Sequence, residues 1–152
     1  MKDMFLSKLA ESSRLIRRAF DARARAIGVT RAQWQVLSAL DRHPGINQGA
    51  LADILDVDPI TVCRMVDRLQ EAALVERRPN PADRRSWQLY LTPKAGELVL
   101  QLRPLADALQ ADALDGVSVD ELASLTALLD RVNANLAGRI NAPELAPEAA
   151  HG

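Results

Sequence analysis

The feature that most restricts the fold of this chain is a change in the spacing of its apolar residues near residue 73. Before that point apolar residues recur every three or four positions, which is the spacing that buries one face of an α-helix. The clearest run is Val62, Met65, Val66 and Leu69. After that point the spacing becomes two, with Trp87, Leu89 and Leu91 separated by polar residues, as in a half-buried strand. The sequence therefore predicts a mainly α-helical fold with one small β-hairpin.

Helix-capping residues divide the part before the hairpin into four helices. A helical pattern covers residues 4–27. The next three helices are predicted to begin after Thr30, Asn47 and Asp58, whose side chains can accept hydrogen bonds from the free N–H groups of a first helical turn. Thr30 also forms a capping-box pattern with Gln33, in which each side chain satisfies a backbone N–H of the other residue.

The hairpin is predicted from strands over 74–78 and 85–91 with a turn over 79–84, and two more helices follow it. The first should run from Pro93 to Ala113, and the second should start at the capping box of Ser118 and Glu121. The second helix carries a long apolar stripe of Leu122, Leu125, Leu128, Leu129, Val132 and Leu136. Because a single chain has no further segment to cover that stripe, we expect a second copy to cover it.

Positive and negative charges are unevenly distributed, although the net charge is only −1. Residues 1–103 hold 17 Lys or Arg against 12 Asp or Glu, while residues 104–152 hold two against eight. Such asymmetry is a hint of nucleic-acid contact at the basic end.

Several other classes of protein are disfavoured by composition. No apolar run approaches the roughly 20 residues that span a bilayer, and the N-terminal segment lacks a signal-peptide pattern, which predicts a cytoplasmic protein. The single cysteine, Cys63, cannot form an internal disulfide. The two histidines, His43 and His151, stand far apart, and the sequence has no metal-ligand cluster, Gly-rich phosphate loop or nucleophile motif. We therefore expect neither an enzyme nor a bound cofactor or metal.

The three helices that begin after Thr30, Asn47 and Asp58, followed by a basic hairpin, have the order of a winged helix-turn-helix, whose third helix is called the recognition helix. In that arrangement the third helix enters the major groove of DNA, and the hairpin, or wing, reaches the minor groove. The sequence also resembles the MarR family of transcription regulators over nearly the whole chain. The resemblance rests on the segments Leu51–Leu55, Val62–Leu69, Leu74–Arg78, Asp83–Arg85 and Leu91–Gly96. One departure is Ala73, where the family usually has a glycine, which would adopt a positive φ more easily. Either Ala73 adopts that conformation at a cost, or the turn after the recognition helix differs.

The resemblance implies DNA-contacting residues in three elements. On the recognition helix they are Ile60, Thr61, Cys63, Arg64 and Arg68. At the start of the preceding helix Gln48 would lie near a phosphate. In the wing Arg85 would enter the minor groove, with Arg84 on the backbone and Asp83 holding Arg85 in position. The alternative is that these arginines are only solvated.

Cys63 also admits a redox-sensing interpretation, because basic residues and an early helical position can stabilise a thiolate. Relatives that sense oxidants usually carry the sensing cysteine in the first helix, and the first helix here has none. The alternative is a small residue that faces DNA.

The resemblance further implies a small aromatic acid or phenol as an effector that releases the DNA. Arg14, Arg17, Arg18 and Trp34 would suit such a ligand by ion pairing and stacking. The alternative is that the arginines are solvated or pair with acids at a dimer interface, and that Trp34 belongs to the core.

Together these implications describe a homodimeric regulator, more often a repressor than an activator, that binds a pseudo-palindromic operator with half-sites about 10 bp apart. The expected regions are a dimerisation helix over 1–29, the winged helix-turn-helix over 30–92, dimerisation helices over 93–141 and a disordered tail over 142–152. A winged-helix module that binds an acidic protein, and an enzyme of unknown type, remain open alternatives. Salt dependence separates the first of these from DNA binding.

Overall fold

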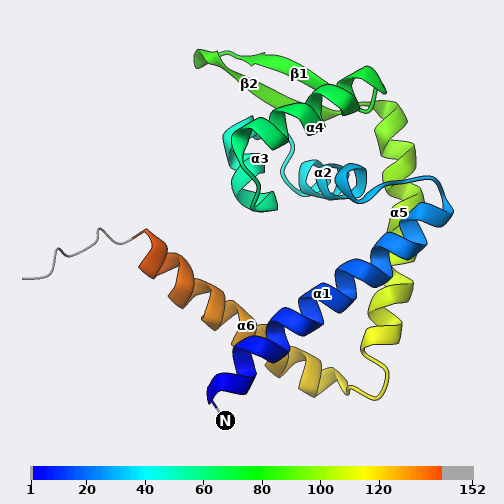
Figure 1. The fold of residues 1–152 in the computed structure, drawn as a ribbon, viewed down its shortest axis with the longest axis vertical. Coiled ribbons are helices and arrows are strands. Elements are labelled where there is room, and N and C mark those ends of the chain that lie inside the picture. The colour runs from blue at the N-terminus through cyan, green and yellow to red at the C-terminus, as the bar shows by residue number, and fades with distance from the viewer. Residues whose placement is uncertain (1, 142–152) are drawn as a thin grey trace, which may run out of the picture. The chain divides into compact units, whose positions relative to one another are not determined.

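The computed structural model describes residues 2–141, which form six helices and one antiparallel pair of strands (Figure 1). The elements are α1 (Lys2–Ala26), α2 (Arg31–Arg42), α3 (Gln48–Leu55), α4 (Pro59–Glu71), β1 (Val75–Asn80), β2 (Asp83–Leu91), α5 (Pro93–Ala113) and α6 (Val119–Ile140). The chain divides into two compact units, residues 1–113 and 114–152, so that α6 lies in the second unit. The predicted mainly α-helical fold with a small hairpin is confirmed. The predicted tail over 142–152 lies outside the described residues.

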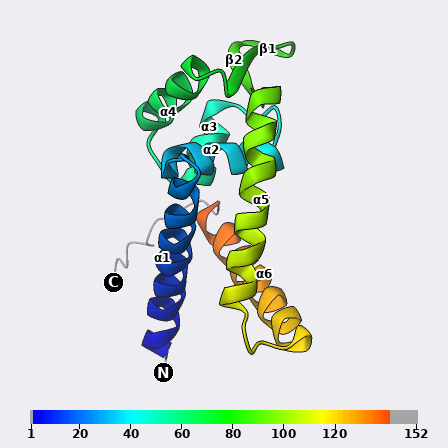
Figure 2. The ribbon, with the colours of Figure 1, turned by 90° about the vertical axis from the view of Figure 1, so that its right-hand side faces the viewer.

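The first unit is built around one apolar core that its helices share with the base of the hairpin. The largest fully buried side chains are Val36, Leu37, Leu40, Leu51, Val62, Val66 and Leu89, from α2, α3, α4 and β2. The long helices α1 and α5 join this core through Phe20 and Val99, and both extend away from the cluster of α2, α3 and α4 (Figure 2). Burying each such side chain contributes about 2 kcal/mol, so the core fixes α4 and the hairpin base against the other helices.

Hydrogen bonds confirm the predicted helix starts. The N–H of Gln33 donates to Thr30 Oγ1 at 3.2 Å, and the N–H of Thr30 donates to Gln33 Oε1 at 2.9 Å. The N–H of Ala50 donates to Asn47 Oδ1 at 2.8 Å, and Ser118 forms a second capping box at the start of α6. Each cap satisfies backbone donors that would otherwise lack a partner in the helix.

Ala73, directly after α4, adopts the left-handed conformation with φ 58°. The position therefore needs the backbone geometry that a glycine would adopt more easily. Two side chains that follow the hairpin hold this turn: Lys94 Nζ donates to the carbonyl of Ala72 at 2.9 Å, and Thr92 Oγ1 donates to the carbonyl of Ala73 at 2.6 Å.

The hairpin is longer than its sequence pattern predicts, and the predicted turn over 79–84 is wrong. Only residues 81 and 82 lie between β1 and β2. Leu89, opposite Arg77, directs its N–H and C=O to Ile46 and Gly45 and not to β1. Pro79 lies two residues after Arg77 and opposite Trp87, so its nitrogen also faces away from β2 and its missing N–H removes no hydrogen bond between the strands. The register shifts between Pro79 and Asn80, and Asn80 Oδ1 accepts the N–H of Ala82 at 3.0 Å to close the turn.

The base of the hairpin is tied to the loop between α2 and α3. The N–H of Gly45 donates to the carbonyl of Leu89, and the N–H of Leu89 donates to the carbonyl of Ile46, both at 2.9 Å. These two bonds attach β2 to the helix-turn-helix. They leave the far end of the hairpin projecting beyond α4 (Figure 1).

Two helices carry several large apolar side chains that remain exposed. On α1 they are Met4, Phe5, Leu6, Leu9, Leu15 and Ile16, and on α6 they are Val119, Leu125, Leu128, Leu136 and Ile140. The helices α3, α4 and α5 each expose one such side chain: Ile54, Ile60 and Leu100. No described residue of α6 is buried. No helix in the described part of the chain is long and apolar enough to cross a membrane.

Candidate nucleic-acid interface

The N-terminus of α4 is held by Asp58. The carboxylate accepts the N–H of Thr61 at 2.8 Å and the hydroxyl of Thr61 at 2.7 Å. Both hydrogen bonds favour the ionised carboxylate and hold the pKa of Asp58 below its ordinary value, and the bond from the backbone N–H has the larger effect. Because the Thr61 hydroxyl proton is used by Asp58, its oxygen is left as an acceptor at the start of the helix.

One face of α4 is buried, and the opposite face presents polar and cationic groups. Val62, Val66 and Leu69 lie in the core. The predicted DNA-contacting residues Ile60, Thr61, Arg64 and Arg68 are all exposed, and Ile60 is 66% exposed. Neither Arg64 nor Arg68 forms an ion pair with another described residue. The exposed face of α4 can therefore offer two free guanidinium groups and an apolar side chain to a partner.

Cys63 is only half-buried, and its surroundings differ from those of a reactive thiol. Its Sγ lies 3.9 Å from Oδ2 of Asp67, one helical turn further along α4. The neighbour in this contact is an acidic side chain, whereas the redox-sensing interpretation needs basic ones. This contact supports the alternative in which Cys63 is a small residue on the exposed face.

The tip of the wing carries Arg85, predicted to enter the minor groove, and Arg84, predicted to contact the DNA backbone. Arg84 and Arg85 are exposed at the start of β2 and form no ion pair within the described chain. Asp83 Oδ1 accepts the backbone N–H of Arg85 at 3.0 Å, so it contacts the main chain and leaves the guanidinium group free. The wing and α4 lie at the same end of the first unit (Figure 1).

A cluster around Arg77 joins the wing to the helices, and the sequence analysis missed it. Arg77 Nε and Nη2 donate to Oε1 of Gln48 at 3.0 and 2.9 Å, and Nη2 also meets Oδ1 of Asp67 at 2.7 Å. Nη1 donates to Oε1 of Gln70. The Gln48 amide oxygen, predicted to lie near a phosphate, therefore accepts from a wing residue. A signal was present, because Arg77 stands two residues after Val75 and so shares the inward face of β1.

A small hollow of about 220 Å³ separates the start of α3 from β2. Its lining residues are Asn47, Gln48, Gly49, Arg85, Ser86 and Trp87. Trp87 is 48% exposed, and Arg85 stands two residues earlier on the same face of β2. The hollow therefore lies beside the wing, and Arg85 is part of its lining.

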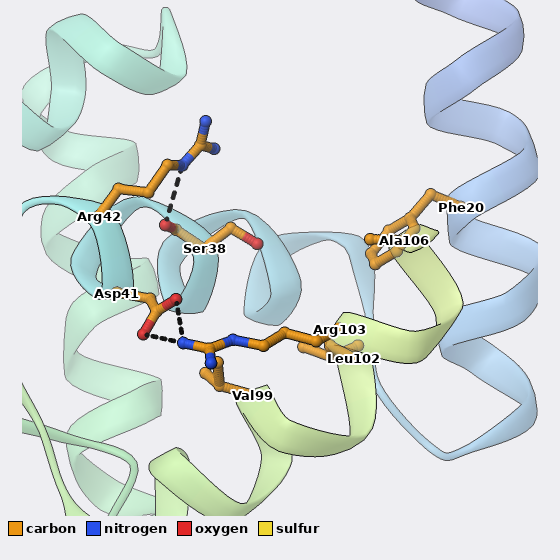
Figure 3. Close-up of a pocket in the computed structure, with 8 residues that line it drawn as sticks. All are labelled: Phe20, Ser38, Asp41, Arg42, Val99, Leu102, Arg103 and Ala106. Atoms are coloured by element: carbon orange, nitrogen blue, oxygen red, sulfur yellow. Dashed lines mark hydrogen bonds and ion pairs between the residues drawn. The ribbon is translucent and has the colours of Figure 1, made fainter. Parts of the chain in front are cut away.

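A second hollow of about 320 Å³ lies among α1, α2 and α5 (Figure 3). Phe20, Val99, Leu102 and Ala106 form its apolar wall. Arg103 of α5 reaches Asp41 of α2 at 3.1 Å, and Arg42 Nε donates to the carbonyl of Ser38 at 3.3 Å (Figure 3). The hollow therefore combines an apolar wall with the ion pair of Arg103 and Asp41, and Arg42 lies at its edge.

The residues predicted to bind an effector do not line this hollow. Arg14, Arg17 and Arg18 are exposed on α1. Trp34 packs edge-on against Phe20, with ring centroids 4.8 Å apart, and its Nε1 donates to Asp21 Oδ1 at 2.8 Å. Effector binding by these four residues stays a prediction. Within the described residues no group of three or more His, Cys, Asp or Glu side chains could hold a metal ion.

Comparisons with known proteins agree with this geometry. Residues 27–86 match the sequence profile of the MarR family. The solved structure of transcriptional regulator PA3341 is 35% identical, covers 88% of this chain and 98% of its own, and has a TM-score of 0.81. Wild-type MarR from E. coli in its apo form is 28% identical, covers 84% of this chain and 95% of its own, and has a TM-score of 0.72. A MarR mutant from E. coli, complexed with operator DNA, is 29% identical, covers 84% of this chain and 92% of its own, and has a TM-score of 0.71.

Proposed function

This chain belongs to the MarR family of transcription regulators, and from that premise we propose that it is a homodimeric repressor that binds a pseudo-palindromic operator. In this proposal α4 enters the major groove and the wing enters the adjacent minor groove. The dimer would contact two half-sites about 10 bp apart. Transcription would be blocked while both lobes occupy the operator.

One observation carries the DNA-binding proposal: four exposed arginines of α4 and the wing form no ion pair with any residue that the structure describes, while the other arginines of the wing are paired. Arg64, Arg68, Arg84 and Arg85 are the free ones. Arg78, on the outer face of β1, instead pairs with Glu76 and lies 4.2 Å over the Tyr90 ring. Free guanidinium groups suit phosphates, bases in the major groove and the narrow minor groove.

The dimer proposal is supported by the exposed apolar faces of α1 and α6. Large exposed apolar faces of this kind mark interfaces in soluble proteins. A two-fold dimer would cover the same face on both copies and would double the number of DNA contacts.

The effector proposal is a small aromatic acid or phenol that favours a dimer with misplaced recognition helices. The hollow lined by Phe20, Asp41 and Arg103 supports it, because its wall is apolar and carries one aromatic ring. The carboxylate of an aromatic acid bound there would replace Asp41 as the partner of Arg103. Arg14, Arg17, Arg18 and Trp34 remain the second proposed site. A ligand can lower the affinity for DNA only to the extent that it binds the dimer with misplaced helices more tightly than the DNA-binding dimer.

Selection of bound duplexes from a random library tests the DNA-binding proposal. The wild type should enrich a two-fold symmetric sequence, and Arg64→Ala and Arg85→Ala should each weaken binding to it at least tenfold. Arg78→Ala is the matched control, because it removes the same charge from the same hairpin but from a paired side chain. Absence of enrichment at low salt by a folded dimer would contradict the proposal and favour an acidic protein as the partner of the wing.

A further inference from the structure

We infer that Arg77 is a positioning residue that locks the base of the wing against α3 and α4 and so determines where Arg85 meets the minor groove. The inference rests on the proposed DNA-binding function. It adds a residue that would act without touching DNA.

The contacts of Arg77 join three separate elements. Arg77 itself belongs to β1, Gln48 is the first residue of α3, and Asp67 and Gln70 lie three residues apart on one face of α4. A planar guanidinium group with five N–H donors in a fixed fork can hold three acceptors at once, which an ammonium group cannot do with the same geometry.

Arg77 has little capacity left for a phosphate. Its side chain is 16% exposed, compared with 54% for Asp67. Its Nε and both Nη atoms already have acceptors within the protein. This distinguishes Arg77 from Arg85, whose guanidinium group has no partner in the described chain.

The cluster also neutralises a carboxylate at the proposed interface. Asp67 lies on α4 one turn after Arg64 and Cys63 and is half-exposed, so an unpaired charge there would repel the phosphates that Arg64 approaches. The ion pair with Arg77 cancels that charge. Arg77 therefore neutralises a negative charge on the exposed face of α4 and also holds the wing in position.

The geometry of β2 explains how a lock at the base controls the tip. Arg77 pairs with Leu89, and Leu89 stands four residues from Arg85 along β2. At about 3.3 Å per residue the distance from Leu89 to Arg85 along β2 is about 13 Å. A tilt of the hairpin by about 10° at its base therefore moves Arg85 by about 2 Å. A shift of that size is enough to withdraw a guanidinium group from hydrogen-bond distance.

A DNA-free measurement tests the lock itself. The chain has two tryptophans, Trp34 and Trp87, so Trp34→Phe leaves Trp87 of β2 as the reporter. In that background Arg77→Met should lower the fluorescence anisotropy of Trp87. Arg78→Met, which removes the neighbouring charge from the outer face, should leave it unchanged. Equal anisotropy in Arg77→Met and its parent would overturn the inference.

A double-mutant cycle tests the consequence for binding, with the duplex that the wild type selects from a random library as the probe. Arg77→Met and Arg85→Ala should each weaken binding at least tenfold, and the double variant should lose little more than the larger single loss. The slope of log binding constant against log salt concentration should decrease in Arg77→Met, relative to the wild type, by no more than it decreases in Arg85→Ala. Arg77→Lys should restore only part of the affinity, because it lacks the fork.

Other outcomes of this cycle would overturn the inference. In one such outcome the double variant loses the product of the two single losses in affinity, and its salt slope is smaller by about one than that of Arg85→Ala. That result would mean that Arg77 contacts a phosphate directly. A lower melting temperature with unchanged affinity of the folded protein would mean a purely structural role. If the wild type selects no duplex, the proposed function fails, while the anisotropy of Trp87 still decides whether Arg77 locks the wing.

Discussion

Ala73 and Asp21 are two single residues whose local environment makes a measurable difference to stability. Ala73 holds a left-handed backbone at the end of α4, and an L-residue with a Cβ is disfavoured there by about 1–2 kcal/mol relative to the right-handed region. Asp21, on α1, accepts hydrogen bonds from two side chains of α2. Both residues affect how α4 and α2 are held, and neither is expected to touch DNA.

Ala73→Gly should raise the free energy of unfolding by about 0.5–1 kcal/mol, because glycine adopts positive φ without steric strain but loses more chain entropy on folding. Urea unfolding of both proteins measures the difference. Ala72→Gly is the matched control, since Ala72 has φ −76° and should gain nothing from the exchange. A destabilised Ala73→Gly variant would show that the Lys94 and Thr92 contacts already remove the strain.

Asp21→Asn should lower the free energy of unfolding by about 1 kcal/mol at pH 7. The hydrogen bond from Arg31, and next the bond from Trp34, hold the pKa of Asp21 below its ordinary value. A depressed folded-state pKa contributes stability above the unfolded pKa, near 3.8, that is lost as the pH falls through the lower folded value.

The difference in the free energy of unfolding between wild type and Asp21→Asn should therefore become smaller at pH values below about 4. Unfolding curves at pH 7 and pH 3 check this. Asp53→Asn, at an exposed carboxylate without a side-chain partner in the described chain, serves as the control. A difference that stays constant with pH would contradict the assignment to the carboxylate charge.

The recognition helix and the wing are two elements with different sources of rigidity. α4 is held by its apolar face and by the cap at Asp58, which are both encoded within the helix and its first turn. The wing has only two strands, which are marginal without further packing, and it depends on bonds from Leu89 and Arg77 to other elements. The wing should therefore be the element most sensitive to distant substitutions.

Asp58→Ala should lower the melting temperature and weaken DNA binding, because the first turn of α4 loses its cap where bases would be contacted. Asp58→Asn keeps an acceptor for the N–H of Thr61 and should retain most of the stability. Thermal unfolding and duplex titration measure the two effects. Equal stability of Asp58→Ala and wild type would show that water replaces the cap.

Across the whole molecule, the exposed apolar faces of α1 and α6 determine how the protein should behave in solution. Leu125, Leu128 and Leu136 leave an apolar stripe on α6 that the described chain does not bury. Interfaces between subunits bury such stripes. The same copies would bring two α4 helices to one operator, which joins assembly to binding.

Leu128→Glu should convert the proposed dimer to a monomer in sedimentation velocity experiments, because a carboxylate would be buried in the interface without a partner. Ala127→Glu is the matched control, since it lies on the opposite side of α6 from the stripe. The monomeric variant should also lose two-fold symmetric DNA binding. A Leu128→Glu protein that remains dimeric would contradict a role of the α6 stripe in assembly.

Local sequence patterns determined much of this protein. Period, caps and turn residues act through neighbours along the chain, so the helix starts after Thr30, Asn47 and Asp58 and the alternation of the hairpin could be predicted. The resemblance to a family then supplied the order of the elements and the exposed arginines.

Only the tertiary structure decided which side chains are free and which are already occupied. Gln48, Asp67 and Gln70 meet Arg77 because folding brings α3, α4 and β1 together, and the longest of these separations is 29 residues. Trp34 likewise finds its partner 13 residues away in Asp21. Local periodicity cannot encode such pairings, since they depend on how buried faces pack against one another in space.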